Sequence, residues 1–230
     1  MNMDPIHEVS VEEGYTRWAA QYEQESNALI LLEEALTRPL LATIPARNVL
    51  DLGTGTGRYA IKLAAQGAQV VAVDQSAAML AVAKQAAMQA GLQIQFRQQR
   101  LDQPLAELPD SFVLVLSALV LCHVEDLALI AREAYRVLTP GGHFLVTDFH
   151  PAVIAAGWRT QFVNDDGAFL LPTARHTVDD YLGALYAAGF QIERVQEGLV
   201  REVPDDAFPA ELVAKDGDKP FCLVILATKP

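Results

Sequence analysis

Val49-Leu50-Asp51-Leu52-Gly53-Thr54-Gly55-Thr56-Gly57 is the stretch of sequence that decides the fold. The apolar run over residues 48–52 predicts a buried strand, and the glycines after it let the backbone turn sharply and approach a ligand. The pattern that follows predicts a helix over residues 58–66. Free N–H groups at the start of a helix favour anionic or hydrogen-bond-accepting groups. The stretch therefore predicts a strand, a ligand-binding turn and a helix.

The spacing of the glycines separates two kinds of ligand. A dinucleotide binder needs G-x-G-x-x-G to seat a pyrophosphate, whereas here the spacing is G-x-G-x-G and Arg58 stands where the third glycine is needed. Asp51 lies two residues before the first glycine, where a carboxylate suits a cation and is badly placed beside a pyrophosphate. This spacing argues against an NAD-dependent oxidoreductase.

A second acid follows the next apolar run. Asp74 ends the strand expected over residues 70–73 and lies 21 residues after Gly53. An acid at this place hydrogen-bonds the ribose hydroxyls of an adenosine. Taken alone, such an aspartate is more often a helix cap, but beside the glycine turn the ribose role is favoured.

Apolar runs and helical periodicities alternate along most of the chain. The expected strands are residues 48–52, 70–73, 94–96, 112–116, 143–147, 190–195 and 221–228, and the expected helices are 58–66, 76–90, 125–138 and 177–188. This order is typical of an open parallel sheet with helices on both faces. We expect one domain over residues 1–230, made of a helical N-terminal lid (1–45), a binding core (46–150), an acceptor-site lid segment (151–185) and C-terminal strands of the sheet (186–230).

The amino-acid composition argues against several classes of binding partner. The net charge is −12, and an acidic surface disfavours nucleic acid and anionic membranes. No apolar run approaches the ~20 residues that span a bilayer, and the N-terminus has no signal-peptide pattern, so we expect a cytoplasmic monomer or homodimer. Cys122 and Cys222 lie in apolar runs, which predicts buried reduced thiols, and no Cys/His spacing predicts a metal site.

The chain resembles the class I S-adenosylmethionine (SAM)-dependent methyltransferases, in their small-molecule branch, over nearly its full length. The matching motifs are the glycine turn, Asp74-Gln75-Ser76 with Met79-Leu80, Leu119-Val120-Leu121-Cys122-His123-Val124, Leu138-Thr139-Pro140-Gly141-Gly142, Ala187-Ala188-Gly189-Phe190 and Tyr15-x-x-Trp18-Ala19-x-x-Tyr22. The resemblance implies a Rossmann-like α/β three-layer sandwich, a seven-stranded sheet whose last strand is antiparallel, SAM as cofactor, and methyl transfer to an O, N or C atom of a small molecule. A SAM-binding partner protein without catalysis is the alternative.

The resemblance also assigns residues to the site. Expected cofactor contacts are Asp51, Gly53, Gly55, Gly57, Asp74, Gln75, Leu101, Asp102, Ser117 and Tyr22, and expected acceptor contacts are Tyr15, Trp18, His176 and Trp158. Two positions depart from the family. Either Asp102 takes the place of the family's acid near the adenine or Arg100 replaces it, and Val113 stands where the family commonly has aspartate.

Two histidines are candidates for catalysis. His123 follows the fourth expected strand and His150 the fifth, and open α/β sheets bind ligands at the carboxyl ends of their strands. An imidazole accepts a proton near neutral pH, which suits a general base for a protonated acceptor. Pro151 biases His150 to an extended conformation and holds its direction. Both histidines have a plain alternative, in which they cap or pack a structural element.

Overall fold

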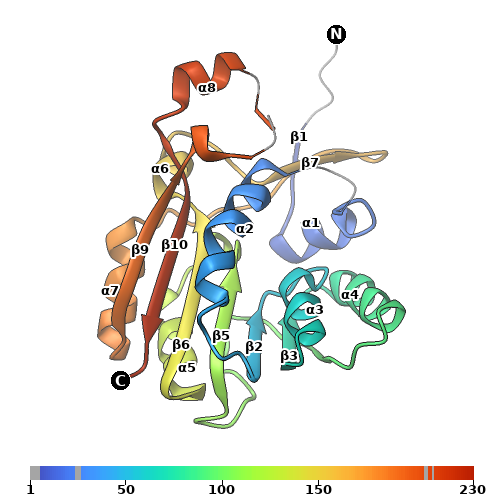
Figure 1. Cartoon of the computed structure of the whole chain (residues 1–230). Coiled ribbons are helices and arrows are strands. Elements are labelled where there is room, and N and C mark those ends of the chain that lie inside the picture. The colour runs from blue at the N-terminus through green and yellow to red at the C-terminus, as the bar shows by residue number, and fades with distance from the viewer. Residues whose placement is uncertain (1–5, 24–26, 205–206, 209) are drawn as a thin grey trace.

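The computed structural model describes residues 6–23, 27–204, 207–208 and 210–230, and its centre is a seven-stranded sheet (Figure 1). The strands are β2 (Asn48–Leu52), β3 (Gln69–Asp74), β4 (Gln95–Gln98), β5 (Phe112–Ala118), β6 (Leu138–Phe149), β9 (Gln191–Leu199) and β10 (Pro220–Thr228). Their order is β4-β3-β2-β5-β6-β10-β9. The pairs from β4 to β6 are parallel, and β10 runs antiparallel to β6 and β9. This confirms the predicted fold and its antiparallel last strand.

Helices cover both faces of the sheet. They are α2 (Ala28–Leu41), α3 (Arg58–Ala65), α4 (Ala77–Gln89), α5 (Leu127–Val137) and α7 (Val178–Ala188). Successive side chains of a strand point to opposite faces. Val115 accordingly packs with α5 and α7, whereas its neighbours Leu114 and Leu116 pack with α2 and α3. All three are completely buried, so this alternation builds a core on each face.

Local signals fix where the helices begin. Ser76 accepts a hydrogen bond from Met79 N and caps α4. Thr177 and Asp180 form a reciprocal capping box at the start of α7, and Gly189 ends that helix in a left-handed conformation. These caps were predicted from the sequence, and each one satisfies backbone groups that a helix end leaves unpaired.

A smaller sheet lies at the end of the main sheet where the parallel strands finish (Figure 1). It consists of β1 (Ile6–Glu8), β8 (Gly167–Leu170) and β7 (Gln161–Asn164), in that order. Three helices lie toward the same end of the main sheet: α1 (Val11–Trp18), α6 (Pro151–Ala155) and α8 (Ala210–Asp216). Trp18 packs there against Phe162, Phe169 and Leu171. We call α1 together with this small sheet the cap.

The cap differs in two ways from the sequence expectation. The lid segment over residues 151–185 was expected to contain no strand, but it includes the β7–β8 hairpin, whose turn ends at Gly167 with φ 130°. Residues 1–45 were expected to be a lid throughout, but Leu29 and Leu32 of α2 are buried against the sheet. In the described part of this segment, α2 therefore belongs to the main fold and α1 to the cap. Within the described residues, no helix combines the length and apolarity needed to cross a membrane.

Candidate functional site

The glycine turn has the backbone conformation that only glycine adopts without strain. Gly53, Gly55 and Gly57 have φ values of 71°, 56° and 88°. A Cβ on Gly53 would lie 2.5 Å from Val120 Cγ2, whereas a Cβ on Gly55 would meet nothing within 4 Å. Gly53 therefore packs against the protein, and Gly55 faces open space beside the end of β2. Gly57 is the N-cap of α3.

Asp51 lies under this turn with only 2% of its surface exposed. Its Oδ2 accepts a hydrogen bond of 2.7 Å from Thr54 Oγ1. Burial raises the pKa of Asp51 to about 6, although the bond from Thr54 and the charge of Arg58 oppose the rise. A buried carboxylate of this kind gains most from a cationic ligand, because a cation compensates the lost solvation.

Asp74 ties the end of β3 to the same turn. Its Oδ2 accepts from Gly55 N at 2.8 Å and its Oδ1 accepts from Ser76 N at 2.8 Å. Burial raises the pKa of Asp74, while these backbone bonds lower it. Each carboxylate oxygen keeps a further lone pair. Asp74 is therefore fixed in place and still able to accept hydrogen bonds from a diol.

A cavity of about 430 Å³ opens above the carboxyl ends of β2, β3 and β5. Ten of the residues expected from the sequence line it: Tyr15, Tyr22, Asp51, Gly53, Gly55, Asp74, Gln75, Leu101, Asp102 and His123. Most of the predicted cofactor residues thus share one cavity with Tyr15 of the acceptor set and with His123. Asp102 and Arg100 both line it and pair with each other, with Arg100 Nη2 2.6 Å from Asp102 Oδ2.

Six expected residues lie outside the lining: Gly57, Ser117, Trp18, His176, Trp158 and His150. Trp18 stacks on Phe162 at 4.9 Å within the cap, and its Nε1 is buried without a hydrogen-bond partner among the described residues. Ser117 is buried in β5, where Oγ also has no partner in the described part of the chain. Trp158 is 45% exposed and contacts Phe221.

The remaining two histidines have structural partners. His176 Nε2 lies 2.7 Å from the carbonyl oxygen of Val124. His150 is the N-cap of α6, where its Nδ1 accepts from Ala152 N at 3.2 Å and its Nε2 lies 3.1 Å from Glu197 Oε1. Both nitrogens of His150 are thus engaged away from the cavity, an arrangement that favours the capping role over the catalytic one.

His123 and Tyr15 face each other inside the cavity. Tyr15 belongs to α1, and its hydroxyl lies 3.1 Å from His123 Nε2. His123 Nδ1 lies 2.7 Å from the carbonyl oxygen of Pro172, which is only an acceptor. The proton of neutral His123 is therefore on Nδ1, and Nε2 presents its lone pair to the Tyr15 hydroxyl. Burial lowers the pKa of His123 and raises that of Tyr15.

Sequence reasoning missed three charged residues that line the cavity, namely Arg58, Glu125 and Asp126. Arg58 lines the cavity, yet in the sequence it was noted only for replacing a glycine. A signal was present, because Arg58 is the first residue of α3 and a cation at a helix N-terminus opposes the helix dipole. Such a placement points to a nearby group that compensates the charge.

Known proteins were compared with the chain and its fold. A family model described as a methyltransferase domain matches residues 50–146. A ubiquinone biosynthesis O-methyltransferase from Xanthomonas euvesicatoria pv. vesicatoria is 33% identical over 182 residues, which are 75% of this chain and 73% of that enzyme. Its namesake from Pseudomonas putida is 35% identical over 101 residues, or 44% of each chain, so this match spans less than half of that relative.

The solved structures include similar chains. An S-adenosylmethionine dependent methyltransferase from Mesorhizobium loti matches with a TM-score of 0.64 and 30% sequence identity, over 86% of this chain and 99% of that one. At 86% of this chain, the match extends well beyond the length of residues 50–146.

Proposed function

The chain belongs to the S-adenosylmethionine-dependent methyltransferase family, and we propose that it methylates a hydroxyl oxygen of a small phenolic molecule bound beside His123. One observation carries the choice of acceptor. The unprotonated Nε2 of His123 faces a phenol hydroxyl, that of Tyr15, inside the cavity that holds Asp51 and Asp74. A phenolic acceptor would present the same group to the same nitrogen.

The polar groups that line the cavity fit SAM. Asp51 offers a buried carboxylate to a cation, Asp74 offers acceptor atoms to a ribose, and Gly55 leaves open space between them. When bound, SAM supplies a methyl group on a sulfonium, whose leaving group is already activated. A pyrophosphate would meet the two carboxylates instead, which disfavours NAD.

His123 has the geometry of a general base for an oxygen acceptor. The Pro172 carbonyl fixes the tautomer, so that Nε2 is the unprotonated nitrogen. An acceptor hydroxyl that replaces the Tyr15 hydroxyl at Nε2 would give its proton to this nitrogen as the acceptor oxygen gains the methyl group. Tyr15 keeps its own proton, because burial raises its pKa well above the ordinary value. It therefore serves as a hydrogen-bond partner that orients the acceptor oxygen.

The cap and the residues that follow α1 cover part of this cavity. Tyr15 and Tyr22 of the N-terminal segment line the cavity, and Tyr22 packs edge-on against Trp18 at 4.9 Å. Thr16 Oγ1 lies 3.2 Å from Ser76 Oγ and joins α1 to the start of α4. Since methyl transfer depends mainly on positioning the two reactants, aromatic side chains that hold the acceptor in place would contribute to the rate. The relatives named for O-methylation in ubiquinone biosynthesis support an oxygen acceptor.

Label transfer tests this function directly. The purified chain would be incubated with methyl-deuterated SAM and a panel of phenols, quinols, amines and indoles, and the products read by mass spectrometry. We expect deuterated methyl ethers from one or more hydroxyl acceptors. Product from amines or indoles alone would contradict the proposed acceptor. SAM binding with no methylated product from any acceptor would favour a non-catalytic partner protein.

A further inference from the structure

Arg58 places a guanidinium on the wall of the cavity at the end where Asp51 lies. It is the first residue of α3, directly after the glycine turn, and its N-cap Gly57 provides no side-chain hydrogen bond. The side chain is 20% exposed and lines the cavity. A cation is unfavourable at a helix N-terminus, so other groups must hold it there.

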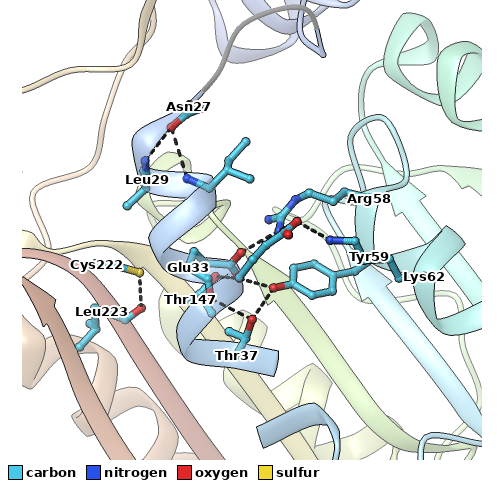
Figure 2. Close-up of polar contacts among 12 residues, drawn as sticks. Asn27, Leu29, Glu33, Thr37, Arg58, Tyr59, Lys62, Thr147, Cys222 and Leu223 are labelled. Carbon is cyan, nitrogen blue, oxygen red and sulfur yellow. Dashed lines mark hydrogen bonds and ion pairs between the residues drawn. The ribbon is translucent and has the colours of Figure 1, made fainter. Parts of the chain in front are cut away.

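Glu33 of α2 is the group that holds this guanidinium (Figure 2). Its side chain is completely buried and accepts from Arg58 Nη1 at 2.7 Å, from Tyr59 Oη at 2.7 Å and from Thr147 Oγ1 at 3.0 Å. The guanidinium carbon also lies 4.3 Å from the centre of the Tyr59 ring, which fixes the plane of the group. The position of Arg58 is therefore determined by three elements of the main fold, α2, α3 and β6.

These contacts use only one nitrogen of the guanidinium. Arg58 Nη1 donates to Glu33 and, at 2.9 Å, to Glu34 Oε1, whereas Nε and Nη2 have no hydrogen-bond partner among the described residues. Nε and Nη2 form one edge of the planar guanidinium, and such an edge binds a carboxylate with two parallel hydrogen bonds.

A zwitterionic ligand carries no net charge, so its binding would leave the charge balance around Arg58 unchanged. Glu33 and Glu34 are matched by Arg58 and by Lys62, which contacts Glu34. Among the described residues that line the cavity, Arg58 and Arg100 are the cations, and Arg100 is engaged with Asp102 and Glu12. A ligand that carries both an ammonium and a carboxylate would pair the first with Asp51 and the second with Arg58.

We propose that Arg58 binds the α-carboxylate of the methionyl group of SAM through Nε and Nη2, and that Glu33 is the positioning residue for this guanidinium. This inference rests on the proposed cofactor site. It adds a carboxylate subsite to it, so that the methionyl group is held at both of its charges while Asp74 holds the ribose. The cavity then orients the sulfonium from two ends.

A matched pair of ligands tests the subsite on the unmodified protein. S-adenosylhomocysteine and its decarboxylated counterpart, S-adenosyl-3-thiopropylamine, differ only in the carboxylate. Calorimetry should show that the wild-type protein binds the first about ten- to a hundredfold more tightly, as expected for charge-assisted hydrogen bonds. Equal affinities would overturn the inference while leaving the cofactor site intact. Binding of neither ligand would overturn the cofactor site and the subsite together.

A pair of variants locates the preference at Arg58. Arg58→Met alone would leave Glu33 buried without its cation, which strongly destabilises a fold, so Arg58→Met is combined with Glu33→Gln. This double variant should bind both ligands with the wild-type affinity for the decarboxylated one. Lys62→Met is the control, since Lys62 shares the contact with Glu34 but lies outside the cavity lining, and it should keep the wild-type preference. A double variant that keeps the preference, or that loses both ligands in equal proportion, would contradict the assignment.

Discussion

Asp51 and Asp74 show how two carboxylates with the same chemistry acquire different roles. Asp51 is bonded through its side chain to Thr54, and burial dominates its pKa. Asp74 accepts two backbone N–H groups that hold it against the glycine turn. Asp51 is therefore suited to a cationic ligand group. Asp74 is a fixed hydrogen-bond acceptor that is suited to neutral hydroxyls.

The affinity for SAM should fall as the pH falls through about 6. Burial disfavours the ionised form of Asp51 and raises its pKa to about 6, so in the free protein a proton occupies the carboxyl below that pH. A cationic methionyl group favours the ionised form, so it must displace this proton. The loss of SAM affinity approaches tenfold per pH unit once the pH is below the pKa of Asp51.

Calorimetric titration of SAM from about pH 7 to pH 5 measures this dependence. Asp51→Asn is the matched control, because the amide keeps the shape of the side chain but does not titrate. We expect the variant to bind SAM more weakly at pH 7 and with most of the pH dependence removed. A wild-type affinity that stays constant over this range would contradict a direct pairing of Asp51 with the cofactor.

At the scale of elements, α6 explains why His150 is buried. The helix begins directly after β6, with Pro151 at its first position and the imidazole of His150 as its N-cap. A side-chain acceptor at the N-cap satisfies one of the free N–H groups of the first turn. The residue that sequence alone suggested as a base thus has a structural task in this position.

His150→Ala should therefore lower stability rather than turnover. Loss of an N-cap costs about 0.5–2 kcal/mol in the free energy of unfolding, which urea denaturation measures. His150→Asn keeps a capping oxygen and should recover most of that loss. Methyl transfer by the Ala variant, assayed well below its melting temperature, should stay near the wild-type rate. A hundredfold drop in turnover with normal stability would restore the catalytic interpretation.

Sequence reasoning worked best where the signal is local. The strands around the glycine turn are continuous apolar runs, and the caps at Ser76 and Thr177 lie next to the helices they start. The small sheet was missed because β1 pairs with β8, about two thirds of the chain away, and three residues give no periodicity. The Asp166-Gly167 pair is a hairpin signal that was overlooked when residues 151–185 were interpreted as a lid segment without strands.

The same distinction applies to the site. The positions of Asp51, Asp74, Gly53 and Gly55 around one cavity were predictable because their spacing reflects one local motif. The segment that forms α2 was placed in the expected N-terminal lid, because nothing in its own sequence shows that its leucines pack on the sheet. The tautomer of His123 depends on Pro172, 49 residues away, so sequence placed both histidines at strand ends without distinguishing them. The packing of α2 and the tautomer of His123 both depend on contacts between segments that are far apart in the sequence.

For the whole molecule, ligand binding should appear as a shift in thermal stability. A ligand that binds only the folded state at a concentration of 100 times its Kd adds about 2.7 kcal/mol. In a domain of this size such a gain raises Tm by roughly 5–10 °C. We expect this shift with S-adenosylhomocysteine in differential scanning fluorimetry. NAD at equal concentration should give none, and a larger shift with NAD would contradict the cofactor assignment.

If methyl transfer in this cavity uses His123 as the base, the pH profile of turnover shows it most directly. With an acceptor from the label-transfer screen, we expect His123→Ala to lower turnover by about 10²-fold or more and to leave SAM affinity nearly unchanged. Burial holds the pKa of His123 below its usual 6.5. The wild-type turnover should therefore not change with pH above 6.5, and it should decrease at lower pH, where the imidazole becomes protonated. That fall should vanish in the variant. Near-normal turnover in a folded His123→Ala protein would contradict the account.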